Sequence, residues 1–202
     1  MKEELQHIHH TLIIERVVPE AEESPLLTES DREYLATLSA PARRAQWSTA
    51  RTILRRELGE EAELRYTSSG ALVLAKPIGG ICSISVSHTS EWVAVLLSGS
   101  RCGVDIELLD RNFSKVASRY ISHEERERLS EKVGEQFEAL MWSAKEAIYK
   151  YGAHEGFDFL RDLVVTDIDT TSSTLYAELY GLPAPPLHYQ LHEDHICCYI
   201  VG

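Results

Sequence analysis

The chain has 202 residues and a formal net charge of −12 at pH 7, with 32 acidic and 20 basic side chains. This acidic balance disfavours general electrostatic binding to nucleic acid or to anionic membranes. No apolar run approaches the ~20 residues that a membrane-spanning helix needs, and residues Met1 to Glu4 do not lead into the apolar core of a signal peptide. We therefore expect a cytoplasmic protein that binds neither nucleic acid nor membrane.

The first strong helix signal runs from Ser39 to Gly59. Ser39 suits the N-cap, Pro41 suits the first turn, and Gly59 suits the position after the last turn. The apolar stripe that would face the core contains Trp47, Ala50, Leu54 and Leu58.

Five arginines lie on this predicted helix: Arg43, Arg44, Arg51, Arg55 and Arg56. Helical spacing places Arg44, Arg51 and Arg55 on one flank. Taken alone, the pattern favours a solvent-exposed face, with ion pairs to the acidic residues Glu57, Glu60 and Glu61.

Short runs of alternating or apolar residues predict strands along most of the remaining chain. The predicted strands are 63–66, 71–75, 82–87, 91–98, 102–109, 163–168, 174–179, 187–191 and 196–201. The turn residues Thr67 to Gly70 make the first two a hairpin. The adjacent Cys197 and Cys198 lie in the last strand as small apolar residues, and no C-x-x-C spacing indicates zinc or redox chemistry.

Two further helices are predicted in the second half. Ser122 and Glu125 have the spacing of a capping box, and a longer helix spans about 135–151 and ends at Gly152. The pattern predicts an α+β fold of two lobes, residues 1–100 and 101–202, each with antiparallel strands and a helical part.

Two segments carry the chemistry. In Gly103-Val104-Asp105-Ile106-Glu107, strand alternation places Asp105 and Glu107 on one face. In Trp142 to Lys150, Glu146 and Lys150 lie one helical turn apart. If they converge, three carboxylates could bind Mg²⁺ beside a lysine that contacts phosphate. The alternatives are a solvated acidic strand end and an ordinary surface ion pair.

The segment Ser85-Val86-Ser87-His88-Thr89 lies at the end of a predicted strand, where hydroxyls, an imidazole and backbone N–H groups could bind phosphate oxygens. Capping of a local turn is the alternative. The chain lacks the G-x-S-x-G elbow of serine hydrolases and the G-x-x-x-x-G-K-[ST] loop of nucleotide triphosphatases.

Together these segments resemble the 4′-phosphopantetheinyl transferase superfamily. Its pair of motifs, G-x-D-x-E and W-x-x-K-E-A-x-x-K, is present as Gly103–Glu107 and Trp142–Lys150, after an S-x-S-H motif at Ser85–His88. Residues Arg119–Glu125 and the arginine helix are also similar to family segments. The resemblance covers about residues 40–152, and the length fits the two-lobed surfactin-synthetase type, which implies a pseudo-two-fold fold and a monomer.

The resemblance implies a holo-[acyl-carrier-protein] synthase type of enzyme. It would transfer the 4′-phosphopantetheine arm of coenzyme A to a serine of an apo carrier protein and release adenosine 3′,5′-bisphosphate. Catalysis would involve Glu146, Lys150 and Asp105, and Mg²⁺ would be held by Asp105, Glu107 and Glu146. Coenzyme A would contact Ser87, His88 and Lys150, and its 3′-phosphate would contact Arg43, Arg51 or both, although helical spacing favours Arg44 with Arg51. Glu146 or a metal-bound water would accept the serine proton.

Two departures touch the coenzyme contacts. Where the family usually has G-K-P, Gly70 is followed by Ala71-Leu72, and the glycine of an S-H-S-G pattern is replaced by Ser90. They motivate an alternative, a non-catalytic module that binds coenzyme A or a carrier protein. A Mg²⁺-dependent phosphodiesterase would share the metal site. The carrier protein is not specified by the sequence, and a basic patch at Arg119, Arg126 and Arg128 is one surface on which it could dock.

Overall fold

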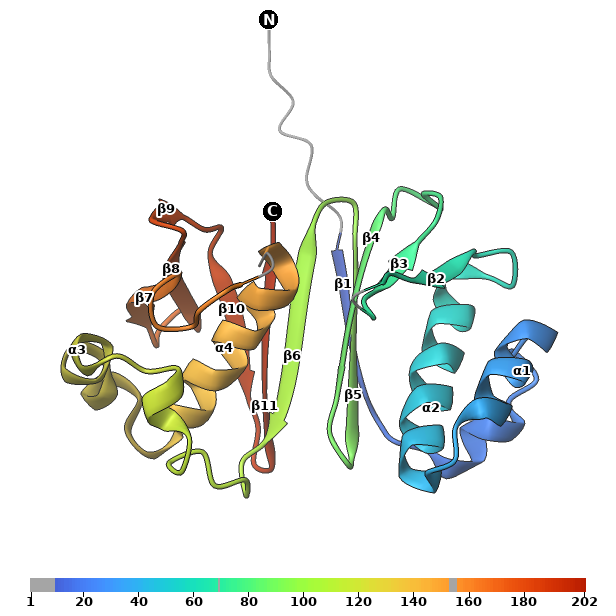
Figure 1. The fold of residues 1–202 in the computed structure, drawn as a ribbon, viewed down its shortest axis with the longest axis horizontal. Helices are drawn as coiled ribbons and strands as arrows, with labels where there is room; N and C mark the ends of the chain where they lie inside the picture. The colour runs from blue at the N-terminus through green and yellow to red at the C-terminus, as the bar shows by residue number, and fades with distance from the viewer. Residues whose placement is uncertain (1–9, 69, 153–155) are drawn as a thin grey trace, which may run out of the picture.

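The structure, a computed structural model, describes residues 10–68, 70–152 and 156–202. The N-terminal segment 1–9 and Ser69 of the predicted hairpin turn lie outside the described residues. The fold is α+β, with antiparallel sheets and helices packed against them (Figure 1). Within the described ranges, no helix is long and apolar enough to cross a membrane.

The first half contains a three-stranded sheet in the order β1-β5-β4 and a separate β2-β3 hairpin. Its strands are β1 (His10–Arg16), β2 (Leu64–Tyr66), β3 (Leu72–Leu74), β4 (Ser83–His88) and β5 (Trp92–Ser98). Its helical segments are η1 (Pro19–Glu23), α1 (Glu29–Thr37) and α2 (Pro41–Leu58).

The second half contains a sheet in the order β6-β11-β10-β8-β7, with β9 paired to β8. Its strands are β6 (Cys102–Leu108), β7 (Leu163–Asp169), β8 (Thr174–Leu179), β9 (Leu182–Pro183), β10 (Leu187–Leu191) and β11 (His195–Val201). Its helical segments are η2 (Ala117–Arg119), α3 (His123–Val133), η3 (Gly134–Gln136) and α4 (Phe137–Gly152).

Strand β5 is buried on both faces, which explains its nearly continuous apolar sequence. Val93 and Val95 pack in one core with Ile53 of α2, whereas Ala94 and Leu96 pack in another with β6 and β11. The two sheets therefore meet along β5 and β6, with α2 and α4 on their outer sides (Figure 1). This arrangement brings β4 next to β6.

Helix α4 packs closely on β6, and Gly103 makes the close approach possible. A β-carbon at position 103 would lie 2.8 Å from the amide nitrogen of Tyr151, and closer still to the carbonyl oxygen of Ala147. The glycine of the G-x-D-x-E motif is thus required by packing between helix and strand. It thereby sets the distance between α4 and the strand face on which Asp105 and Glu107 follow.

The predicted strands agree with the structure to within two residues at either end. The capping box of Ser122 and Glu125 is confirmed at the start of α3. The N-cap prediction for α2 is wrong, because Ala40 occupies the N-cap without a side-chain bond and Pro41 follows it. Strand β1 and helix α1 were not predicted. The pseudo-two-fold relation of two lobes, divided near residue 100, stays a prediction.

Candidate functional site: a cationic cleft beside an acidic strand

The structure brings the two motif segments together at Asp105. Its carboxylate oxygen Oδ1 accepts hydrogen bonds from Ser87 Oγ at 2.8 Å and from Lys150 Nζ at 2.9 Å. Lys150 also donates to the carbonyl oxygen of Val104 at 2.9 Å, and the Val104 N–H donates to Ser85 Oγ at 3.0 Å. Two serines of β4 and a lysine of α4 therefore satisfy polar groups along the edge of β6.

Glu107 lies on the same face of β6, as strand alternation predicts. Its Oε1 accepts hydrogen bonds from Trp142 Nε1 at 2.6 Å and from Arg111 Nη1 at 2.7 Å. The Arg111 guanidinium lies 5.2 Å from the centre of the Trp142 ring. The tryptophan of W-x-x-K-E-A-x-x-K thus orients the second carboxylate of G-x-D-x-E.

The charge of Asp105 disfavours the ionised forms of Glu107 and Glu146. Burial and the charge of Asp105 raise the pKa of Glu107. Burial, followed by the charge of Asp105, raises the pKa of Glu146 to about 6. The neighbouring cation Lys150 opposes this effect at Glu146 without cancelling it. A site that concentrates negative charge in this way favours a cation.

The three carboxylates, of Asp105, Glu107 and Glu146, are ligands of the chemical type that Mg²⁺ prefers. One of their oxygen atoms, Asp105 Oδ2, shows whether a cation is needed there. Asp105 is 4% exposed, and its Oδ2 is buried without a hydrogen-bond partner in the part of the chain that the structure describes. Such an orphaned carboxylate oxygen suits a hard cation, which usually takes one or two protein carboxylates with water and phosphate oxygens. Within the same described ranges, however, no three acidic, histidine or cysteine side chains already form a group that could hold a metal ion.

A cleft of about 900 Å³ adjoins this acidic strand. It lies among α2, the β2-β3 hairpin, β4 and the end of α4, and Lys150 is common to the cleft and to the Asp105 cluster. Three cationic side chains line it, from Arg43, Arg51 and Lys150, and no carboxylate is found among its described lining residues. In a chain of net charge −12, this local excess of positive charge marks a site for an anion.

Arg43 and His88 contact each other at the cleft, where an Arg43 Nη1 nitrogen lies against His88 Nε2. Burial, with the charges of Arg43 and Lys150, lowers the pKa of His88 to about 4. The imidazole is therefore neutral near pH 7, and it can offer one N–H donor but no formal charge. Ser85 lines the cleft, whereas the Ser87 hydroxyl is directed to Asp105.

Arg44 is not brought to this cleft, which corrects the expectation that it contacts the coenzyme together with Arg51. Its guanidinium donates to Glu22 at 2.6 Å and to the carbonyl oxygen of Leu35 at 2.8 Å. Helical spacing alone favoured Arg44, but η1 and α1 pack against that flank of α2 and occupy it. Arg43, one position earlier, faces the cleft.

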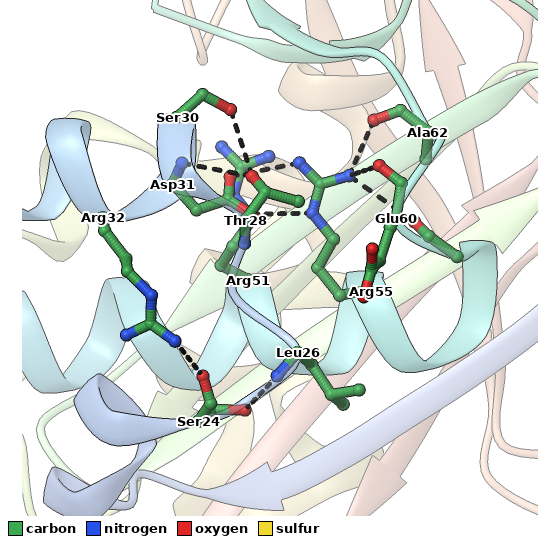
Figure 2. Close-up of polar contacts among 11 residues, drawn as sticks. Ser24, Leu26, Thr28, Ser30, Asp31, Arg32, Arg51, Arg55, Glu60 and Ala62 are labelled. Carbon is green, nitrogen blue, oxygen red and sulfur yellow. Dashed lines mark hydrogen bonds and ion pairs between the residues drawn. The ribbon is translucent and has the colours of Figure 1, made fainter.

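The exposed arginine face predicted for α2 is also corrected. Arg51 and Arg55 are buried, and both pair with Asp31 of α1 (Figure 2). Arg43 and Arg56 are exposed, and Arg56 pairs with Glu57 at 2.8 Å and with Glu15 at 2.7 Å. Asp31 was missed because its partner arginines are distant in sequence, although Thr28 and Asp31 have a capping-box spacing that could have placed a helix start there.

Lys145, the first lysine of W-x-x-K-E-A-x-x-K, is not available to a ligand. It is fully buried and donates to Glu125 and to the carbonyl oxygens of Phe159 and Leu163, each at 3.0 Å. Glu125 also accepts from the Val165 N–H at 2.9 Å. The lysine ties α4 to α3 and β7, so its role is structural.

Three residues near the site, Arg111, Tyr149 and Phe157, were not predicted from the sequence. Arg111 follows Glu107 by four residues and pairs with it. In a helix this spacing predicts an ion pair, but Glu107 ends a strand, so the spacing gave no such signal. Tyr149 and Phe157 line the cleft and lie with their ring centres 5.4 Å apart. Tyr149 lies inside the motif Trp142–Lys150, and this position is the sequence signal that could have drawn attention to it.

Comparison with known proteins agrees with the motif segments. A family model described as the 4′-phosphopantetheinyl transferase superfamily matches residues 101–200, which include Asp105, Glu107, Glu146 and Lys150. A comparison with curated proteins finds no significant match.

Proposed function

This chain belongs to the 4′-phosphopantetheinyl transferase superfamily, and on that premise we propose that it transfers the 4′-phosphopantetheine arm of coenzyme A to an apo carrier protein. The acceptor is a serine hydroxyl of the carrier, the leaving group is adenosine 3′,5′-bisphosphate, and the reaction depends on Mg²⁺. We expect the protein to act in the cytoplasm as a monomer, with coenzyme A and the carrier as its partners.

The observation that carries this proposal is the position of Lys150. Its ammonium group lies at the boundary between the cationic cleft and the acidic strand, 2.9 Å from Asp105. Coenzyme A has a pyrophosphate in its middle and a phosphate monoester at its nucleotide end. A cleft lined by three cations, one of which also contacts a carboxylate of the acidic strand, suits this distribution of charge.

We assign the cations of the cleft accordingly. Lys150 binds the pyrophosphate, next to Asp105, Glu107 and Glu146, which would hold the metal. Arg43 and Arg51 bind the 3′-phosphate, and neutral His88, which contacts Arg43 in the free protein, would contact a phosphate oxygen once it exchanges that partner. When bound, Mg²⁺ neutralises charge on the pyrophosphate and on the leaving group.

Glu146 is the residue that we propose as proton acceptor. With no metal bound, its pKa of about 6 leaves it ionised near pH 7, and a carboxylate oxygen that the metal does not use would accept the proton of the serine hydroxyl. The serine oxygen forms a bond to the phosphorus that carries pantetheine. The bond from that phosphorus to the adenosine bisphosphate breaks, and the electron pair leaves with the bisphosphate.

Mass spectrometry of an apo carrier protein tests the transfer. The chain is incubated with coenzyme A and Mg²⁺, and addition of phosphopantetheine to the carrier is the expected result across at least one of a panel of fatty-acid, polyketide and peptide-synthetase carriers. Asp105→Asn removes a metal ligand and should abolish modification, whereas Arg44→Met, outside the cleft, should leave it unchanged. A panel that stays unmodified would contradict the proposal.

The alternative, a binding module without turnover, is favoured by one observation. Ala71 lines the cleft, and the resemblance to the family implies a lysine next to Gly70, where this chain has Ala71. Coenzyme A that binds without modification of any carrier would support this alternative. Release of free phosphopantetheine without a carrier would instead identify a phosphodiesterase.

A further inference from the structure

Two buried arginines share one carboxylate beneath the cleft. Asp31, Arg51 and Arg55 are 4–6% exposed, and Figure 2 shows both guanidinium groups beside the Asp31 side chain. Burial alone would raise the pKa of Asp31, but bonds from Arg55 and Thr28 and the charge of Arg51 lower it overall. The carboxylate is ionised, so this buried group of three has a net charge of +1.

Arg55 takes most of the available acceptors. Its Nε and Nη2 donate to the two carboxylate oxygens of Asp31 at 2.7 and 3.1 Å. Its Nη1 donates to the carbonyl oxygens of Glu60 at 2.9 Å and of Ala62 at 2.8 Å. Arg55 is thereby fully engaged in holding the end of α2 to the following loop and to α1.

Arg51 is left with a weaker share of the same carboxylate. Its Nε lies 3.4 Å from Asp31 Oδ1, and its Nη1 is buried with no hydrogen-bond partner in the described residues. Burial lowers the pKa of Arg51, and the charge of Asp31 opposes this effect without removing it. Tyr66 and the Trp47 ring, 4.9 Å from the guanidinium carbon, compensate Arg51 in part. Its Nη1 still lacks an acceptor among the described residues, so an anion would complete the hydrogen bonding of this buried cation.

The surroundings show from which side an anion would come. Arg51 lines the cationic cleft and also a second cleft of about 610 Å³ on its other side. The second cleft is lined by four carboxylates, from Asp31, Glu60, Glu61 and Glu63. Because Arg51, Arg55 and Arg65 also line the second cleft, its four carboxylates leave it a formal charge of −1. The first cleft has three cations and no carboxylate among its described lining residues, a formal charge of +3, so an anion favours the first cleft.

We propose that Arg55 is a positioning residue, which occupies the Asp31 carboxylate and so leaves the Arg51 guanidinium able to bind a phosphate monoester in the cationic cleft. The inference rests on the proposed function for the identity of that monoester, the 3′-phosphate of coenzyme A. Without Arg55, Asp31 would pair in full with Arg51, and the cleft would lose both a net positive charge and a donor.

Calorimetric titration of the full chain with coenzyme A and with 3′-dephospho-coenzyme A, in the absence of a carrier, tests the inference. The two ligands differ only in the phosphate monoester, so the ratio of their dissociation constants isolates that contact. For the wild type we expect coenzyme A to bind about tenfold to a hundredfold more tightly, the range of one or two charge-assisted hydrogen bonds. Arg55→Met should reduce this preference by about tenfold.

A double variant separates positioning from a structural role. Arg55→Met combined with Asp31→Asn removes the carboxylate that captures Arg51, so the preference should return to within about threefold of the wild type. A merely structural role predicts the reverse, because the double variant loses more hydrogen bonds than the single one. Arg44→Met, an arginine of the same helix that does not line the cleft, is the matched control and should leave the ratio unchanged.

Thermal melting followed by circular dichroism establishes that each variant is folded, and Arg55→Lys replaces Arg55→Met if the latter does not fold, with a smaller loss expected. A wild type without preference for coenzyme A, a single variant with the wild-type ratio, or a double variant no better than the single one would each overturn the inference. Because no carrier is present, a failure of transfer contradicts the proposed reaction without affecting these results.

Discussion

Replacing Glu146 by glutamine should stabilise the protein at alkaline pH while abolishing its proposed activity. Burial and the charges of Asp105 and Glu107 hold the pKa of Glu146 at about 6, above the ordinary value of 4.5. The folded state therefore binds this proton more tightly than the unfolded state does. The carboxylate form imposes a cost on folding at any pH above both values, and the neutral amide of glutamine avoids it.

The pKa difference sets the magnitude and the pH range. A rise from 4.5 to about 6 corresponds to about 2 kcal/mol, and the partial exposure of Glu146 reduces the expected gain to about 1 kcal/mol. Below pH 4.5 the wild-type side chain is protonated in both states, so the variant should gain nothing. The gain should appear between pH 4.5 and 6 and stay constant above that range.

Urea unfolding at pH 4, 5, 6 and 8 in buffer with a chelator measures this directly. Addition of Mg²⁺ at pH 8 should then stabilise the wild type more than the variant, because the ion binds the folded carboxylates. Glu131→Gln, at an exposed position of α3, is the control and should show no such dependence. A Glu146→Gln variant that is less stable than the wild type at pH 8, or equally stable at every pH, would refute the assigned repulsion.

Three further substitutions test packing and charge around the site. Gly103→Ala should destabilise the fold by about 3 kcal/mol or more, because its β-carbon meets the carbonyl of Ala147; a wild-type melting temperature would contradict this. Lys145→Met should cost about 3–5 kcal/mol in urea unfolding by leaving the Glu125 carboxylate buried and unpaired; a cost below about 1 kcal/mol would indicate that Glu125 is rehydrated. Ala71→Lys adds a fourth cation to the cleft, so the calorimetric dissociation constant for coenzyme A should fall about threefold to tenfold, and weaker binding would show that the side chain does not reach the phosphates.

Local periodicity was sufficient to predict the acidic strand and the helix above it. Strand alternation places Asp105 and Glu107 on one face of β6, and helical spacing places Glu146 and Lys150 on one face of α4. Both placements are independent of the tertiary fold. The structure adds the reason for the glycine at position 103, where α4 packs on β6. Gly103 is required by the approach of α4, which depends on a tertiary contact that no local pattern records.

The arginines of α2 show where sequence reasoning fails. Helical spacing correctly groups Arg51 with Arg55 but cannot say which element covers that flank. The cover is α1, a helix of only nine residues whose capping box uses Asp31 instead of the more usual glutamate. With α1 unpredicted, burial of two arginines with one aspartate was not foreseeable, and an exposed face was the better expectation.

Lys150 links the two electrostatic environments of this molecule. Its ammonium group lowers the repulsion that Asp105 and Glu107 impose on Glu146, and the same charge helps to keep His88 neutral on the cleft side. When a ligand phosphate binds Lys150, the negative charge of the phosphate offsets part of the positive charge that stabilises the ionised carboxylates. The carboxylates then become more dependent on a bound cation, while the negative charge of the ligand favours the protonated form of His88. Binding of an anionic substrate and of a metal are therefore expected to be favourably coupled through this one side chain.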